Sequence, residues 1–192
     1  MFSNVLKNLF DFLIRMKLLV AFLLLACTIF TFMQMRPTGK KLYTPETKLG
    51  ILNLEFAYNT QHTSTILSAW QADDKIKSAK ENTYIDFALL ICYSLFLFYS
   101  CKNISAIFKG KLRNTAMFLA KASLIAGGLD VLENCGMLVT LSGNQSGIVA
   151  LITVTCSIIK WGIAVIAVLY LLFLSPYALY LSLKKKSRTS VN

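Results

Sequence analysis

Residues 116–141 form an apolar stretch that is long enough to cross a bilayer and that nevertheless carries ionisable side chains. Asp130, Glu133 and Asn134 fall in its second half, where an unpaired charge is costly. On a helix, steps of three and four residues place small and then polar residues on one face: Ala116, Ala120, Ser123, Gly127, Asp130, Asn134 and Met137. Small residues permit close helix contact, so we expect this face to meet protein and not lipid.

The composition predicts a polytopic membrane protein. Of 192 residues, 56% are hydrophobic and 15% are charged, and the mean hydropathy is +0.59. A net charge of +11 would suggest nucleic-acid binding in a soluble protein, but basic residues also gather in cytoplasmic loops. The five cysteines lie in or beside apolar runs without C-x-x-C spacing. We therefore expect no nucleic-acid partner, no metal, no disulfide framework and no cofactor.

The predicted fold class is an all-α membrane protein: a four-transmembrane-helix bundle with an N-terminal amphipathic interfacial helix and one large extracytoplasmic loop. Apolar runs of sufficient length predict the four spans, at residues 18–34, 83–101, 114–141 and 147–174. Residues 1–17 have an apolar and a polar face at helical spacing, so they are expected to lie on the membrane surface. After a bend or a helix end at Pro176, residues 175–192 are expected to form a basic solvated tail.

A processing signal is an alternative interpretation of the N-terminal region. Basic residues precede Leu18–Leu25, as in a signal peptide, and residues 24–27 resemble a lipoprotein cleavage box. The apolar run continues past Cys27, however, which favours a helix that is retained.

The loop of residues 35–82 contains Pro37, Gly39 and Pro45, which predict irregular backbone. Further along, Thr60 is expected to cap a short helix from Gln61 to about Gln71. We expect this helix to lie over the mouth of the bundle with Trp70 near the lipid headgroups. One side of it carries Ile66, Leu67 and Trp70.

The distribution of basic residues predicts the orientation. Residues 1–17 carry three, the 102–113 link four and the tail four, whereas the 35–82 loop balances seven with five acids. The positive-inside rule therefore places both termini and the link in the cytoplasm. The expected partners are membrane lipids, including anionic lipids at the basic tail, and a second copy or another membrane protein.

Four short motifs lie in or beside the predicted spans: Gly50-Ile-Leu-Asn-Leu-Glu-Phe-Ala-Tyr58, Tyr84-Ile-Asp-Phe87, Gly128-Leu-Asp-Val-Leu-Glu-Asn134 and Ile158-Ile-Lys-Trp161. Together they resemble a functionally uncharacterised family of small bacterial four-helix integral membrane proteins, which has D-x-x-E-N in its third helix and K-W in its fourth. The chain has Asn53 and Glu55 where the family's loop motif has Asp and Gln. The resemblance covers most of the chain after about residue 48. It implies the architecture and a bacterial inner-membrane location, and it implies no activity.

Counting outward from the short turn at residues 142–146 compares depths on the third and fourth spans. With Asn144 as the centre, Asp130 is level with residue 158, and Lys160 lies about 3 Å deeper at the helical rise per residue. Lys160 also shares one face with small and polar residues, namely Thr153, Ser157, Ala164 and Ala167. We therefore predict an ion pair between Asp130 and Lys160.

Glu133 and Asp86 are expected nearer the outer surface, so that three carboxylates face one lysine. The two excess charges predict a protonated carboxyl group or a bound cation, water or ligand group. The candidate ligand-binding residues are Asp86, Asp130, Glu133, Asn134 and Lys160, with Glu55 and Tyr58 at the mouth. Two alternatives stay open: the ion pair only fixes helix register, and the apolar neighbours of Glu55 only anchor an interfacial loop.

Three classes of function fit these residues. The favoured one is binding of a small polar ligand, an ion or proton, or a lipid headgroup at the outward face. A lipid-modifying membrane enzyme would instead use a carboxylate as general base, and a structural or accessory subunit would use the cluster for packing. The single histidine, His62, has no partner at catalytic spacing, and the chain lacks metal, Walker and serine-hydrolase motifs. No catalytic residue is therefore assigned.

Overall fold

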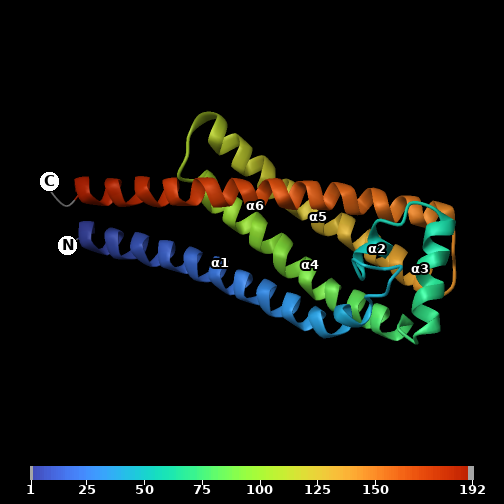
Figure 1. Ribbon diagram of the computed structural model, residues 1–192. Helices are drawn as coiled ribbons and strands as arrows, with labels where there is room; N and C mark the ends of the chain where they lie inside the picture. The colour runs from blue at the N-terminus through green and yellow to red at the C-terminus, as the bar shows by residue number, and fades with distance from the viewer. Residues whose placement is uncertain (1, 190–192) are drawn as a thin grey trace.

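The computed structural model describes residues 2–189, with side chains for residues 17–178, 180 and 181. This part of the chain is all-helical (Figure 1): α1 Phe2–Lys41, α2 Leu52–Glu55, α3 Thr60–Ala72, α4 Ile76–Ser105, α5 Gly110–Leu141 and α6 Gly147–Thr189. Four segments are long and apolar enough to span a membrane, namely Lys17–Lys41 of α1, α4, α5 and Gly147–Ala178 of α6. The predicted number of spans is confirmed.

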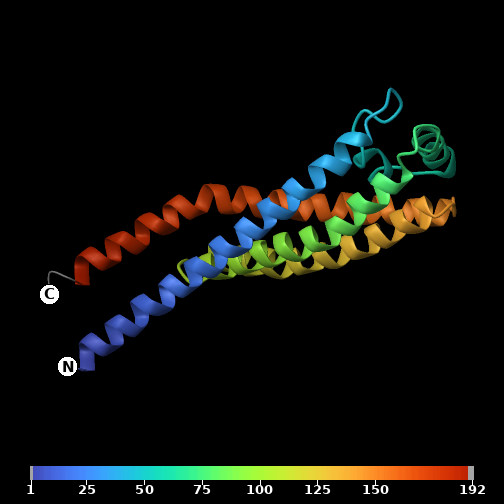
Figure 2. The ribbon, with the colours of Figure 1, turned by 90° about the horizontal axis from the view of Figure 1, so that it is seen from below.

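The four long helices run along one axis, and α4 is central because it packs against α1, α5 and α6. Both termini lie at one end of the molecule, and α2, α3 and their loop gather at the other (Figure 1). Viewed from below, the N-terminal half of α1 diverges from the other helices (Figure 2). Accordingly, none of the most apolar 18 residues of α1 is buried inside the protein. We call the end that carries α2 and α3 the loop end.

The first predicted boundary needs correction, because α1 continues to Lys41 without a break after residue 34. Pro37 lies inside the helix, where its ring removes one backbone hydrogen bond. Asn82 of α4 supports this region by donating from Nδ2 to the carbonyl of Met35, at 2.8 Å, and to the Thr38 hydroxyl, at 2.9 Å. A neighbouring helix that satisfies polar groups near a proline lets a membrane helix continue through it. The side chains of residues 2–16 lie outside the described set, so their surface location stays a prediction.

Three other boundaries also move. Because α4 begins at Ile76 and α1 ends at Lys41, the predicted 35–82 loop shrinks to residues 42–75. The 102–113 link shrinks to residues 106–109, since α4 runs to Ser105 and α5 begins at Gly110. The boundary predicted between the fourth span and the tail at residue 175 also moves. The helix α6 continues through Pro176 to Thr189, so most of the predicted tail has helical backbone. Figure 2 shows α6 bending in its C-terminal half.

The short helix α3 buries Ile66, Leu67 and Trp70, the three residues predicted to share one of its sides. Its N-cap is Asn59 and not Thr60, because Asn59 Oδ1 accepts a hydrogen bond from the His62 amide at 2.7 Å. The Trp70 side chain is completely buried in protein, and its predicted depth near the lipid headgroups stays a prediction. Trp70 Nε1 donates to the carbonyl of Leu42 at 3.0 Å. It therefore fixes the start of the loop to α3.

The polar face predicted on α5 is buried in protein, and two glycines on α5 explain its close helix contacts. A Cβ on Gly127 would lie 2.8 Å from Ser94 Oγ and 2.9 Å from Ser94 Cβ, on α4. A Cβ on Gly136 would collide with the Thr153 hydroxyl on α6. Gly127 thus sets the approach to α4 and Gly136 the approach to α6, which places α5 between them.

We predict that Gly127→Ala lowers the thermal stability of the purified protein in detergent, by about 1–3 kcal/mol, because α4 and α5 must move apart. The neighbouring Gly128 provides a matched control, since a Cβ there meets nothing within 4 Å. Gly128→Ala should leave the unfolding temperature unchanged or raise it slightly, because alanine favours helix. Equal losses in the two variants would mean that the α4–α5 approach is assigned wrongly.

Candidate functional site

Lys160 of α6 forms two short ion pairs with α5. Its Nζ lies 2.6 Å from Asp130 Oδ1 and 2.9 Å from Glu133 Oε1. The three side chains are almost inaccessible to solvent, with exposed fractions of 7%, 2% and 0%. In such a low-dielectric setting each ion pair is strong, and a charge without a partner would be expensive. The predicted pair between Asp130 and Lys160 is confirmed, and Glu133 shares the same ammonium group.

This geometry follows from two local features of the sequence. Asp130 and Glu133 are three residues apart on α5, so both side chains lie on the same face of the helix. The turn between α5 and α6 is only five residues long, with Gly143 in the left-handed region at φ +98°. Such a turn makes the two helices antiparallel neighbours, which brings Lys160 beside the α5 carboxylates.

A fourth carboxylate reaches Lys160 from outside the long helices. Glu55, on the short helix α2, is 8% exposed, and its Oε2 lies 3.8 Å from Lys160 Nζ. The same oxygen accepts a hydrogen bond from Trp161 Nε1 at 3.2 Å. The Ser157 hydroxyl donates to the backbone carbonyl of Glu55 at 3.1 Å. The extracytoplasmic loop predicted from the sequence therefore inserts a charged residue into the bundle.

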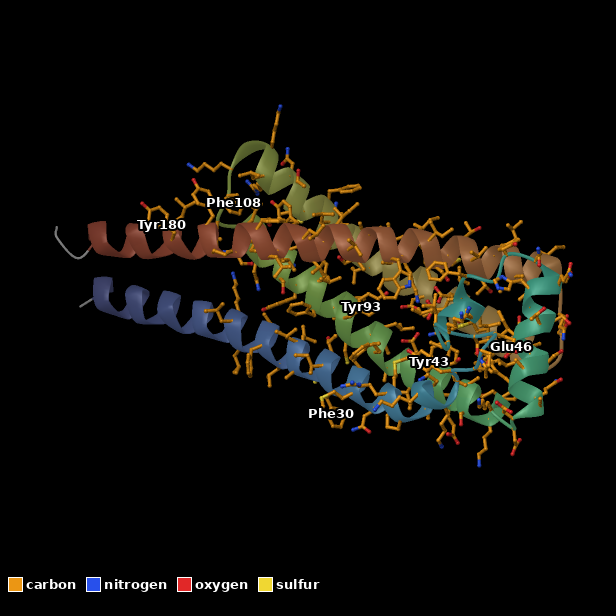
Figure 3. The ribbon with its side chains drawn as sticks, in the orientation of Figure 1. Phe30, Tyr43, Glu46, Tyr93, Phe108 and Tyr180 are labelled. Carbon is orange, nitrogen blue, oxygen red and sulfur yellow. The ribbon has the colours of Figure 1, made fainter. Side chains whose placement is uncertain are left out.

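Two residues of α4 complete the arrangement. The Tyr93 hydroxyl donates to Asp130 Oδ2 at 2.8 Å, so Asp130 is bonded through both oxygens. Asn134 Nδ2 donates to Asp86 Oδ2 at 3.0 Å. Figure 3 labels Tyr93 on α4, midway along the molecule. We call the whole set the Lys160 cluster: Glu55, Asp86, Tyr93, Asp130, Glu133, Asn134 and Lys160.

Two buried oxygen atoms of the Lys160 cluster have no hydrogen-bond partner within the described part of the chain. They are Glu133 Oε2 and Asn134 Oδ1, and both side chains are completely buried. A buried acceptor without a donor costs free energy, and buried polar groups in native proteins are normally satisfied. The two atoms therefore mark where a proton or a small donor group would be stabilising.

The structure brings together six of the seven predicted ligand-binding candidates. Tyr58 is the exception: it is 64% exposed and its ring contacts His62, with centroids 5.4 Å apart. Glu55 proves to be buried within the cluster and not at a solvent-facing mouth. Sequence reasoning missed Tyr93, although it lies seven residues after Asp86 and hence on the same helical face. The roles of Trp161 and Ser157 depend on the returning loop, and no spacing in the sequence indicates them.

The fold and the site together define a multi-pass helical membrane protein with a buried lysine–carboxylate cluster. No protein-family model matches this chain, and no curated protein and no solved structure is significantly similar to it. Among the described residues, no group of three or more His, Cys, Asp or Glu is arranged to hold a metal ion. The geometry of the Lys160 cluster is therefore the main evidence on function.

We predict that Lys160→Met destabilises the protein by about 3–5 kcal/mol, because Asp130 and Glu133 would both lose their buried counter-ion. Asp130→Asn should cost less, since Lys160 keeps Glu133 and the excess negative charge falls. Adding Glu133→Gln to Lys160→Met should recover part of the loss. Thermal unfolding in detergent measures these differences.

Lys121→Met on the exposed surface of α5 is the matched control and should have little effect. Equal losses for Lys160→Met and Asp130→Asn, with no recovery in the double variant, would contradict a shared ion-pair network.

Proposed function

We propose that this chain is a bacterial inner-membrane protein that binds a small cation in the Lys160 cluster, and that the bound cation is a proton. In this proposal both termini and the 106–109 link are cytoplasmic, and the loop end faces the outside. Glu133 lies eight residues before the end of α5 at Leu141, which is about 12 Å at the helical rise. The site would then be in the outer half of the membrane.

The observation that carries this proposal is the charge imbalance of the Lys160 cluster. Glu55, Asp86, Asp130 and Glu133 together would bring four negative charges, and Lys160 is the one cation among them. Each of the four carboxylates is less than 9% exposed, so water cannot stabilise the three excess charges. Protonating a carboxyl group, or binding a cation, removes part of this cost.

Glu133 is the carboxyl group best placed to carry the exchangeable proton. Its Oε1 faces Lys160, whereas its Oε2 has no partner within the described residues. Asp130, by contrast, accepts from Lys160 and from Tyr93, which stabilise its charged form. A proton at Glu133 Oε2 would lower the charge of the cluster while Oε1 still accepts a hydrogen bond from Lys160, whose ion pair with Asp130 is kept.

The alternatives fit the geometry less well. A lipid headgroup needs room beside the polar groups, whereas every carboxylate of the cluster is covered by protein. A purely structural ion pair needs one carboxylate for Lys160, whereas this chain buries four. A lipid-modifying enzyme would need to bind its substrate beside the same carboxylates, which protein covers, so this alternative fits poorly for the same reason.

A hydrophobic carbodiimide tests the proposal, because it reacts with protonated carboxyl groups in apolar surroundings. We expect dicyclohexylcarbodiimide to label Glu133 in the purified, folded protein, as measured by peptide mass spectrometry. The labelled fraction should fall as the pH rises, because the ionised group does not react. Ionisation of Glu133 is opposed by its burial and by the charges of Glu55 and Asp130, and it is favoured by Lys160.

Exposed Glu81, at the loop end of α4, should stay unlabelled, and Glu133→Gln should remove the label without unfolding the protein. Replacing choline chloride in the buffer with sodium chloride should not reduce the labelling of Glu133. Reduced labelling in sodium chloride would identify sodium as the bound cation. If no carboxyl group of the Lys160 cluster is labelled at any pH at which the bundle is folded, proton binding is excluded.

The proposed orientation makes a separate prediction. Reporter fusions after residue 73 should be active outside the cytoplasm, whereas fusions in the 106–109 link and at residue 192 should report the cytoplasm. The reason is that basic residues are in excess at the end of the molecule that carries the termini. A cytoplasmic signal from the fusion after residue 73 would reject the orientation.

A further inference from the structure

Glu55 is the one member of the Lys160 cluster that does not belong to a long helix. It lies on α2, a helix of only four residues whose N-cap makes no side-chain hydrogen bond. The segment of residues 51–58, which we call the cover, packs Glu55 against α5 and α6. The attachment of this segment therefore determines how a cation could reach the Lys160 cluster.

Both ends of the cover are fixed, and a glycine lies at the first of them. On one side, Trp70 holds residues 42–47 through the carbonyl of Leu42 and the Thr47 hydroxyl, and Gly50 then turns at φ +60°. On the other side, Asn59 caps α3. The side-chain hydrogen bonds of Trp70 involve none of the eight residues between these points, although Leu54 and Ala57 share its apolar core. Gly50 permits a backbone conformation that other residues avoid, and its missing side chain leaves space for Tyr43.

The polar contacts that hold the cover onto α6 are few and long. The Lys160–Glu55 distance is 3.8 Å, against 2.6 and 2.9 Å for the other two carboxylates. The closest polar contact of the Glu55 carboxylate is with Trp161 Nε1, at 3.2 Å, and Ser157 contacts only the backbone carbonyl. Because Lys160 keeps two short ion pairs without Glu55, withdrawal of Glu55 does not leave it unpaired. The same withdrawal removes one of the four negative charges from the buried cluster.

We propose that the cover is a removable lid over the Lys160 cluster, that Trp161 is the positioning residue that holds it closed through Glu55, and that the cation enters from the loop end when Glu55 withdraws. This inference rests on the proposed cation site and adds its route of access. Leu54 and Ala57, both buried against α3 and α5, make the closed state the resting state.

Trp161→Phe isolates the proposed contact. Phenylalanine retains an aromatic ring near Lys160, whose Nζ lies 5.9 Å from the Trp161 ring centroid, but it lacks the N–H that binds Glu55. Tyr170→Phe is the matched control, because it also removes one hydrogen bond of α6, from the Tyr170 hydroxyl to the carbonyl of Leu112 at the opposite end. Both variants use the full chain in lipid nanodiscs.

We expect amide hydrogen exchange in residues 51–58 to be about tenfold faster in Trp161→Phe than in the unsubstituted protein, since a hydrogen bond to a charged group stabilises the closed state. Exchange in residues 60–72 of α3 should be unchanged, because Trp70 still anchors that region. A water-soluble carbodiimide should also label Glu133 faster in Trp161→Phe. Tyr170→Phe should match the unsubstituted protein in all three measurements.

Two results would overturn the lid. One is unchanged exchange in residues 51–58 of Trp161→Phe; the other is faster exchange without faster labelling of Glu133 by the water-soluble reagent. Either result could occur while dicyclohexylcarbodiimide still labels Glu133, which would retain the cation site and reject only the lid. Conversely, faster exchange of the cover in a protein in which no carboxyl group of the Lys160 cluster is ever labelled would reject the proton site itself, and with it the route of access.

Discussion

The contact between Lys160 and its two α5 carboxylates is the interaction on which the arrangement of the bundle depends. It joins α5 to α6 at distances of 2.6 and 2.9 Å, and Asp130 extends the network to α4 through Tyr93. Association of membrane helices gains little from the hydrophobic effect, so packing and polar contacts of this kind carry more of the specificity. Glu55 then connects the same lysine to the loop, so one side chain relates three structural units.

Much of the fold could be predicted from the sequence, because membrane spans depend on the length and hydropathy of continuous segments. Apolar run length gave four spans, and the short turn gave an antiparallel pair of helices, as the structure shows. The ends of α1 and α6 were missed for a different reason. Pro37 and Pro176 usually end a helix in water, but α1 is supported by Asn82, a residue that is distant in the chain. Such support cannot be read from a proline and its neighbours.

In the candidate site too, contacts between two helices joined by a short turn could be predicted, whereas contacts made by the loop could not. Depth counting from the turn placed Asp130 beside Lys160, because the helical rise is constant on both sides of a hairpin. The same reasoning could not place Glu55, since the irregular loop has no fixed rise per residue. Tyr58 was grouped with Glu55 because both lie in the same loop segment, but α2 ends at Glu55 and Tyr58 is exposed. Proximity in the sequence does not place side chains together where the helix ends.

The unequal apolarity of the spans has a consequence for biosynthesis. The α5 span has the lowest mean hydropathy, 1.4 against 2.3 for the Lys17–Lys41 segment, and 44% of its most apolar window is buried. A nascent α1 can therefore leave the translocon into lipid alone, whereas α5 exposes Asp130 and Glu133 until Lys160 is synthesised. The ribosome must add some thirty residues in that interval. Release of α5 and α6 into the bilayer as a preassembled pair would avoid that exposure. The five-residue turn shortens the interval between synthesis of the carboxylates and synthesis of Lys160.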